Sequence, residues 1–74
     1  MVEPIAVDTL VILASNTPPL GTGSLNFNFL NEHRAVGIPV PVTKEVTRFE
    51  GEVKLPSGFL LPITLRDIRR VESC

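Results

Sequence analysis

The sequence predicts a single small all-β domain spanning residues 1–74. Residues 5–14 are rich in β-branched and aliphatic side chains, and residues 47–55 alternate strictly between charged side chains and apolar or small ones. Seven prolines and five glycines break the chain into short segments between these runs. Short apolar or alternating runs separated by turn residues are typical of β-strands. A chain of 74 residues has room for one hydrophobic core.

The first predicted element is a buried strand over residues 5–14, because both of its alternating faces are apolar from Thr9 onward. Residues 15–24 follow, with two prolines and two glycines among small polar residues. Neither a helix nor a strand tolerates that composition, so we expect a long loop here.

Two further strands are predicted before the middle of the chain. Residues 25–30 place Leu25, Phe27 and Phe29 on one face of a half-buried strand. Residues 38–42 form an edge strand or a polyproline segment, with Ile38, Val40 and Val42 turned inward. Because Pro39 and Pro41 lack amide donors, a central strand is excluded for this segment.

A hairpin is predicted around residues 56–58, because Pro56 favours the first turn position and Gly58 can adopt a positive φ. Its first arm, residues 47–55, turns one side chain in two toward the core. The inward set is Thr47, Phe49, Gly51, Val53 and Leu55. Its return arm, residues 59–65, contains Pro62 and is therefore expected at a sheet edge or a bulge.

The C-terminal segment predicts one helical turn and a last strand. Thr64 can cap the turn, and the Asp67 side chain can reach back to the cap. We expect Ile68 and Val71 to point inward and the last two residues, Ser73 and Cys74, to be frayed.

The order of four sequence features resembles that of the Src-homology-three-like small β-barrel superfamily. These features are the V-D-T-L-V-I-L run, the proline-bearing loop, the F-E-G-E-V arm, and L-R-D-I before R-R-V-E. That resemblance implies a barrel of about five strands, with a long first loop and a short helical turn before the closing strand. The alternative fold is an open β-sandwich-like or intertwined dimer. Because barrels of this kind serve as peptide binders, RNA binders and accessory subunits, the fold alone does not decide the function.

The composition indicates a cytoplasmic protein, because Cys74 is the only cysteine and no basic N-terminal region precedes an apolar stretch. The longest apolar run, residues 10–14, is too short to span a membrane. With four phenylalanines as its only aromatic side chains and no disulfide within the chain, the core is expected to gain stability from self-association.

The sequence offers little catalytic chemistry. A nucleophile needs a base within reach, and the only pair that suggests itself is His33 with Cys74. One histidine and one cysteine cannot build a zinc site, and Glu50 and Glu52 are expected on a solvated face beside Arg48 and Lys54. We therefore expect no enzymatic activity, no metal and no cofactor.

Two functions are expected from what remains. The first is a non-enzymatic interaction or accessory protein that self-associates or docks on a larger protein through its apolar, proline-rich segments. Its candidate contact residues are Pro18, Pro19, Leu20, Ile38, Pro39, Val40 and Pro41. The alternative is a nucleic-acid-binding barrel that uses basic side chains. Those residues are Arg48, Lys54, Arg66, Arg69 and Arg70.

Overall fold

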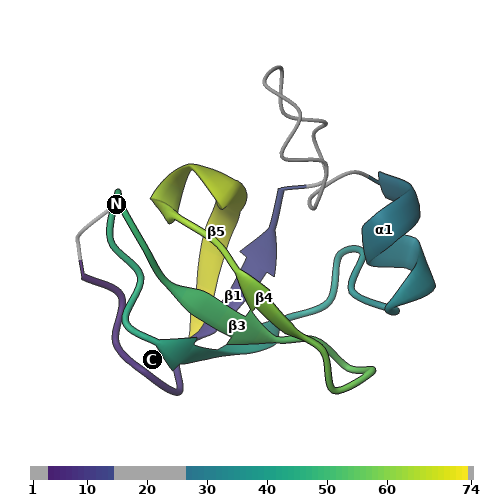
Figure 1. Cartoon of the computed structure of the whole chain (residues 1–74), viewed down its shortest axis with the longest axis horizontal. Helices are drawn as coiled ribbons and strands as arrows, with labels where there is room; N and C mark the ends of the chain where they lie inside the picture. Colours follow the sequence, from purple (N-terminus) through teal and green to yellow (C-terminus); the bar gives the residue numbers. More distant parts are fainter. Residues whose placement is uncertain (1–3, 15–26, 74) are drawn as a thin grey trace.

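The computed structural model describes residues 4–14 and 27–73, and its five strands form one antiparallel sheet (Figure 1). The strands are β1 (Leu10–Leu13), β2 (Val40–Lys44), β3 (Glu52–Lys54), β4 (Leu60–Pro62) and β5 (Ile68–Ser73). Their order across the sheet is β4-β3-β2-β1-β5. One short helix, α1 (Phe27–Glu32), precedes β2, and a 3-10 turn (Leu65–Asp67) precedes β5.

This architecture confirms the all-β fold, the five strands and the helical turn near the C-terminus. A closed barrel is wrong for the described residues, because the edge strands β4 and β5 do not pair with each other and the sheet stays open. The long first loop predicted over residues 15–24 lies outside the described residues.

The core lies on the inner face of this sheet. Val42, Val53 and Leu61 are opposite one another on β2, β3 and β4, and all three are buried. On β1, Val11 and Leu13 continue the same buried layer. Aliphatic side chains that pack in register across neighbouring strands thus provide most of the buried surface.

The first strand is shorter than predicted, because a turn interrupts it. Thr9 N donates to Ala6 O at 3.2 Å, and Asp8 adopts a φ of 76°. Aspartate tolerates this left-handed conformation better than most residues do. Ile5, on the far side of the turn, still reaches the core by pairing with Val46.

The strand predicted over residues 25–30 is wrong for its described part, because Phe27 begins helix α1. Leu30 is the one buried residue of the helix, whereas Phe27 is exposed. The helix ends in a tight turn, in which Ala35 N donates to Leu30 O at 2.7 Å. Leu30 and Ala35 are buried together in this helical conformation. Their burial outweighs the strand conformation that the alternation of apolar residues predicts.

β2 lies at the centre of the sheet, so its predicted edge position is wrong. Val42 N donates to Thr9 O on the β1 side, and successive residues of a strand direct their backbone groups to opposite sides. The nitrogen of Pro41 therefore points toward β3, whose pairing with β2 begins only at Val42. Pro41 lacks an amide donor, but its nitrogen lies outside the stretch of β2 that pairs with β3. A central strand can therefore contain Pro41. Val40 and Val42 point inward as predicted, but Ile38 is exposed.

The hairpin between β3 and β4 is confirmed. Gly58 N donates to Leu55 O at 2.8 Å, and Gly58 has a φ of 95°. A three-residue loop that ends in a positive-φ residue is a common hairpin connection. Pro62 lies on the edge strand, as expected. In the first arm Gly51, Val53 and Leu55 are buried, but Phe49 is exposed, so the predicted alternation is wrong at that residue.

The C-terminal turn follows the prediction, because Thr64 N donates to Asp67 Oδ2 at 3.0 Å. Ile68 is buried, whereas Val71 is exposed, which corrects its expected inward position. Ser73 pairs with Leu10 as part of β5 and is therefore not frayed. Cys74 lies outside the described residues.

Candidate interaction site at the Phe49 turn

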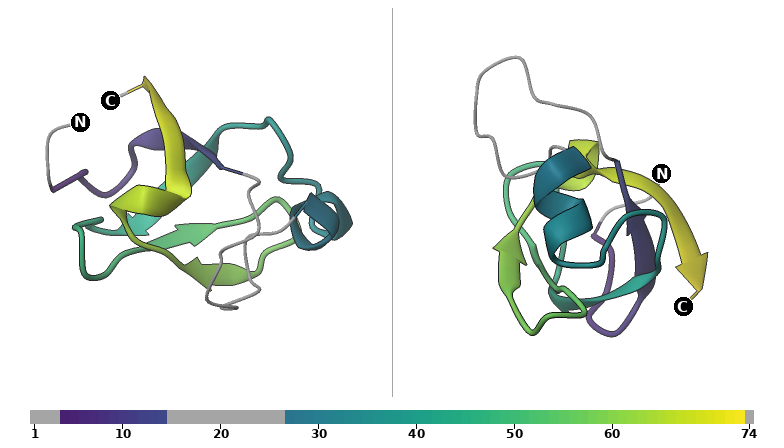
Figure 2. Two further views of the ribbon diagram at one scale, coloured as in Figure 1. Left: turned by 90° about the horizontal axis from the view of Figure 1, so that it is seen from above. Right: turned by 90° about the vertical axis from the view of Figure 1, so that its right-hand side faces the viewer.

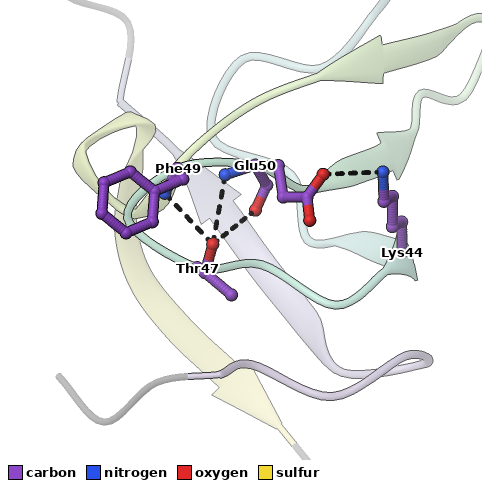
Figure 3. A network of polar contacts seen from close by, with 4 residues as sticks. All are labelled: Lys44, Thr47, Phe49 and Glu50. Atoms are coloured by element: carbon purple, nitrogen blue, oxygen red, sulfur yellow. Dashed lines mark hydrogen bonds and ion pairs between the residues drawn. The ribbon is translucent and has the colours of Figure 1, made fainter.

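A hydrogen-bonded turn over residues 47–50, which we call the Phe49 turn, connects β2 to β3 (Figure 3). Thr47 N donates to Glu50 O at 2.6 Å, which closes the turn. The Thr47 hydroxyl oxygen accepts hydrogen bonds from Phe49 N and Glu50 N, both at 3.1 Å. This is how threonine caps the first amides of a turn, and it fixes the backbone that carries Phe49.

The base of the Phe49 turn is attached to the rest of the fold at three points. Lys44 Nζ forms an ion pair with Glu50 Oε1 at 3.0 Å (Figure 3). Leu65 N donates to Thr47 O at 3.0 Å, which ties the turn to the 3-10 turn. Gly51, directly after the turn, lies against the buried Val46. These contacts limit the movement of the turn.

Phe49 projects from this fixed turn into solvent, with 83% of its surface exposed. The guanidinium of Arg48 lies 5.9 Å from the centre of the Phe49 ring, within the range of a cation–π contact. A phenylalanine ring gains free energy whenever it leaves water. A rigidly presented and exposed ring is therefore suited to insertion into an apolar pocket of another molecule.

Replacing Thr47 by valine is expected to loosen the Phe49 turn while leaving the core intact. The variant removes the hydroxyl that accepts two backbone hydrogen bonds, at a cost of about 0.5–2 kcal/mol in unfolding free energy. Urea denaturation gives the stability, and amide hydrogen exchange at Phe49 and Glu50 gives the local opening. Thr43→Val is the matched control, because its exposed hydroxyl donates to the Glu52 side chain and, among the described contacts, to no backbone group. Unchanged exchange in the Thr47 variant would contradict a capping role.

The basic residues predicted as nucleic-acid contacts are all exposed, but they come from several parts of the fold. Arg48 belongs to the Phe49 turn, and Arg66 follows Leu65, which is bonded to that turn. Lys54 lies on β3, whereas Arg69 and Arg70 lie on β5, and β2 and β1 separate these two strands in the sheet. The structure thus brings the backbones of Arg48 and Arg66 into one neighbourhood.

The residues predicted as protein contacts are divided by the structure. Ile38 and Pro39 are exposed and Pro41 is partly exposed, but Val40 is buried in the core and cannot be reached from outside. Pro18, Pro19 and Leu20 lie outside the described residues.

An aromatic cluster that the sequence did not predict lies where α1 meets the β3–β4 hairpin. The His33 ring lies 4.5 Å from the Phe29 ring and 5.1 Å from the Phe59 ring, measured between centres. His33 Nδ1 and Ser57 Oγ are 2.7 Å apart. Figures 1 and 2 place α1 at the end of the molecule opposite to the Phe49 turn.

The contact between His33 and Ser57 brings a potential base to a potential nucleophile, unlike the pair with Cys74 considered from the sequence. Nucleophilic catalysis also needs a group that orients the base. Among the described residues no carboxylate contacts the His33 ring, whose neighbours are Phe29, Phe59 and Ser57. The described contacts thus account for His33 as a bridge between α1 and the hairpin.

No three His, Cys, Asp or Glu side chains of residues 4–14 and 27–73 gather in a way that could hold a metal ion. Within the same residues, no helix has the length and apolarity needed to cross a membrane. The chain matches no protein-family model, no curated protein and no solved structure.

Proposed function

We propose that this chain is a non-enzymatic interaction or accessory protein that docks on a larger protein through the Phe49 turn and also self-associates. The observation that carries the proposal is Phe49, which is 83% exposed on a turn held by the Thr47 side chain. Exposed aromatic residues that enter a partner's pocket commonly dominate the binding energy of an interface. Because the turn is already ordered, little conformational entropy is lost on docking.

The chemistry around Phe49 defines the partner surface that would fit. Glu50 forms an ion pair with Lys44, and the guanidinium of Arg48 lies beside the ring. Arg66 follows on the segment that is bonded to the turn. An apolar pocket with acidic groups on its rim would complement this arrangement, because opposite charges across an interface favour encounter and fix orientation.

The same residues favour one alternative, a nucleic-acid-binding protein. An exposed aromatic ring beside arginine can stack on a base while the arginine contacts phosphate. Arg48 and Phe49 would form this platform, and Arg66, Lys54 and the arginines of β5 would extend it. Binding of this kind weakens steeply with salt, because phosphate neutralisation releases counterions. Docking in an apolar pocket depends much less on salt.

Two further features belong to the proposal. The 3-10 turn leading into β5 supports the resemblance to Src-homology-three-like domains. The single cysteine supports a reducing compartment such as the cytoplasm.

Replacing Phe49 by a photo-crosslinking benzoyl-phenylalanine is expected to yield one discrete protein adduct in cells of the native host. The same replacement at Phe27, another exposed phenylalanine, is the matched control and should not yield that adduct. With the purified partner, Phe49→Ser should raise the Kd by about tenfold or more, the usual effect of removing an aromatic anchor. Binding by the wild-type chain should persist at high salt.

Three results would oppose this proposal. A crosslink from position 49 to nucleic acid would favour the alternative function. Equal adducts from positions 49 and 27 would indicate nonspecific contact. An unchanged Kd for the Phe49→Ser variant, with the fold intact by circular dichroism, would remove Phe49 as the anchor.

A further inference from the structure

The two edges of the sheet differ in how they are protected. β4 is three residues long and ends in Pro62, which lacks an amide donor. β5 is six residues long, contains neither proline nor glycine, and includes the β-branched Ile68 and Val71. A short edge strand with proline discourages pairing with another chain, whereas a longer edge without proline exposes more backbone groups that can pair.

The sequence of β5 is complementary to itself in charge. If two copies of the strand run antiparallel with Val71 opposite Val71 of the second copy, Arg70 of each copy faces Glu72 of the other. Opposite charges that face each other across an antiparallel pair are stabilising, and like charges are destabilising. We propose that β5 pairs in this register with β5 of a second copy of the chain.

The positions of these side chains in the single chain fit such a pair. Within the single chain, Arg70 Nε and Glu72 Oε2 form an exposed ion pair at 3.1 Å, so both charges lie together where a second copy would add its own Arg70 and Glu72. Val71 is 40% exposed, and the dimer would remove its apolar surface from water, which is favourable. Figure 2 shows β5 on the outside of the molecule with its outer edge uncovered by the other drawn strands.

The pairing of β5 with β1 leaves Arg70 and Val71 as the regular stretch of the strand, with the register shifts at Arg69 and Glu72 on either side. Two register shifts occur along β5, and between them Arg70 and Val71 stay in consecutive register with Ile12 and Val11. Bulges raise the twist of a strand, so the pairing of two β5 strands should be short and centred on this regular stretch. A dimer of this kind joins two five-stranded sheets at their edges.

This inference specifies the self-association named in the proposed function and rests on it. The Phe49 crosslink tests docking on a different protein, so a monomeric chain would defeat the β5 dimer and leave that docking to be judged separately.

Charge reversal within β5 tests the register. In the Arg70→Glu variant, the new carboxylate at residue 70 faces Glu72 of the second copy, so two negative charges meet. In the Glu72→Arg variant, the new guanidinium at residue 72 faces Arg70 of the second copy, so two positive charges meet. Each single variant is expected to raise the dimer dissociation constant by about tenfold, because like charges that meet at an interface oppose association. An equal mixture of the two variants restores both opposite-charge pairs and should form a heterodimer. Sedimentation equilibrium over a range of concentrations measures all three samples.

The controls carry the same charge changes away from β5. Arg66→Glu matches the first variant and Glu45→Arg the second, because both residues are exposed and lie outside this strand. Both controls should dimerise like the wild-type chain.

The inference is overturned if the wild type is a monomer throughout, if the mixture fails to associate, or if the controls weaken the dimer equally. Loss of the dimer in the Glu72 variant alone would indicate an Arg69–Glu72 register and would also overturn the one proposed.

A covalent test locates the symmetry axis. Residues directly opposite in an antiparallel pair have Cα atoms about 4.5–5.5 Å apart, which a disulfide can bridge. In a Cys74→Ser background, Val71→Cys should therefore oxidise rapidly to a disulfide-linked dimer, whereas Lys54→Cys on β3 should not. Equal rates for the two positions would contradict the β5 pairing.

Discussion

Replacing Leu30 by alanine is expected to lower the free energy of unfolding by about 2–5 kcal/mol, the usual cost of a large-to-small change in a core. Leu30 is fully buried and is the only buried residue of α1. Because a small domain has a total stability at the low end of the range of about 5–15 kcal/mol, a loss at the upper end of the range expected for this replacement would unfold much of the population. Chemical denaturation followed by circular dichroism gives the value.

Phe27→Ala on the same helix is the matched control and should change the stability by about 0.5 kcal/mol or less, because Phe27 is exposed. The comparison also separates the two conformations of this segment. In the half-buried strand predicted from the alternation, Phe27 would lie on the buried face and its replacement would be costly. A larger loss from the Phe27 variant than from the Leu30 variant would contradict helix α1.

Gly51→Ala is the second change with a large expected effect. A Cβ atom at residue 51 would lie 2.7 Å from the Cα of Val46 and 2.8 Å from its Cγ2 atom. Val46 cannot easily move away, because it exchanges backbone hydrogen bonds of 2.9 and 3.0 Å with Ile5 and is fully buried. Overpacking of this kind costs about 1–3 kcal/mol, and contact with backbone places this site at the upper end. Thermal denaturation measures the shift in Tm.

The neighbouring Lys54→Ala replacement on β3 provides the control, because its side chain is exposed and the strand is kept. We expect its Tm to stay close to that of the wild type. If Gly51→Ala were equally mild, the close approach between residues 46 and 51 would be wrong, and with it the anchoring of the Phe49 turn.

The parts of the fold that could be predicted are those where local chemistry and tertiary contacts favour the same structure. Pro56 and Gly58 define a turn whatever surrounds them, and the Asp67 side chain reaches back to Thr64 within one local segment. The position of β2 could not be predicted. Pro39, just before the strand, and Pro41 within it suggest an edge, and the location of Pro41 beyond the β3 pairing depends on the register of three strands.

The Phe49 turn was missed because the alternation of residues 47–55 is that of a continuous strand. A local signal opposed it, since Thr47 is followed by Glu50 three residues later, the spacing of a capping box. The aromatic cluster had no such signal, because Phe29, His33 and Phe59 come from separate segments. Val40 was predicted as a protein contact because it is apolar, but the same property suits a core residue, and Val40 is buried in the core.

Solution mass by light scattering, at two protein concentrations and in low and high salt, with and without a mixed oligonucleotide pool, tests the proposed function most directly. We predict a mass that rises toward a dimer with protein concentration and does not change when oligonucleotides are added. High salt should weaken the dimer only modestly, because backbone hydrogen bonds and Val71 contribute alongside the ion pairs. A monomer that gains mass with oligonucleotides in low salt, and loses that mass in high salt, would contradict a protein-interaction function and favour nucleic-acid binding.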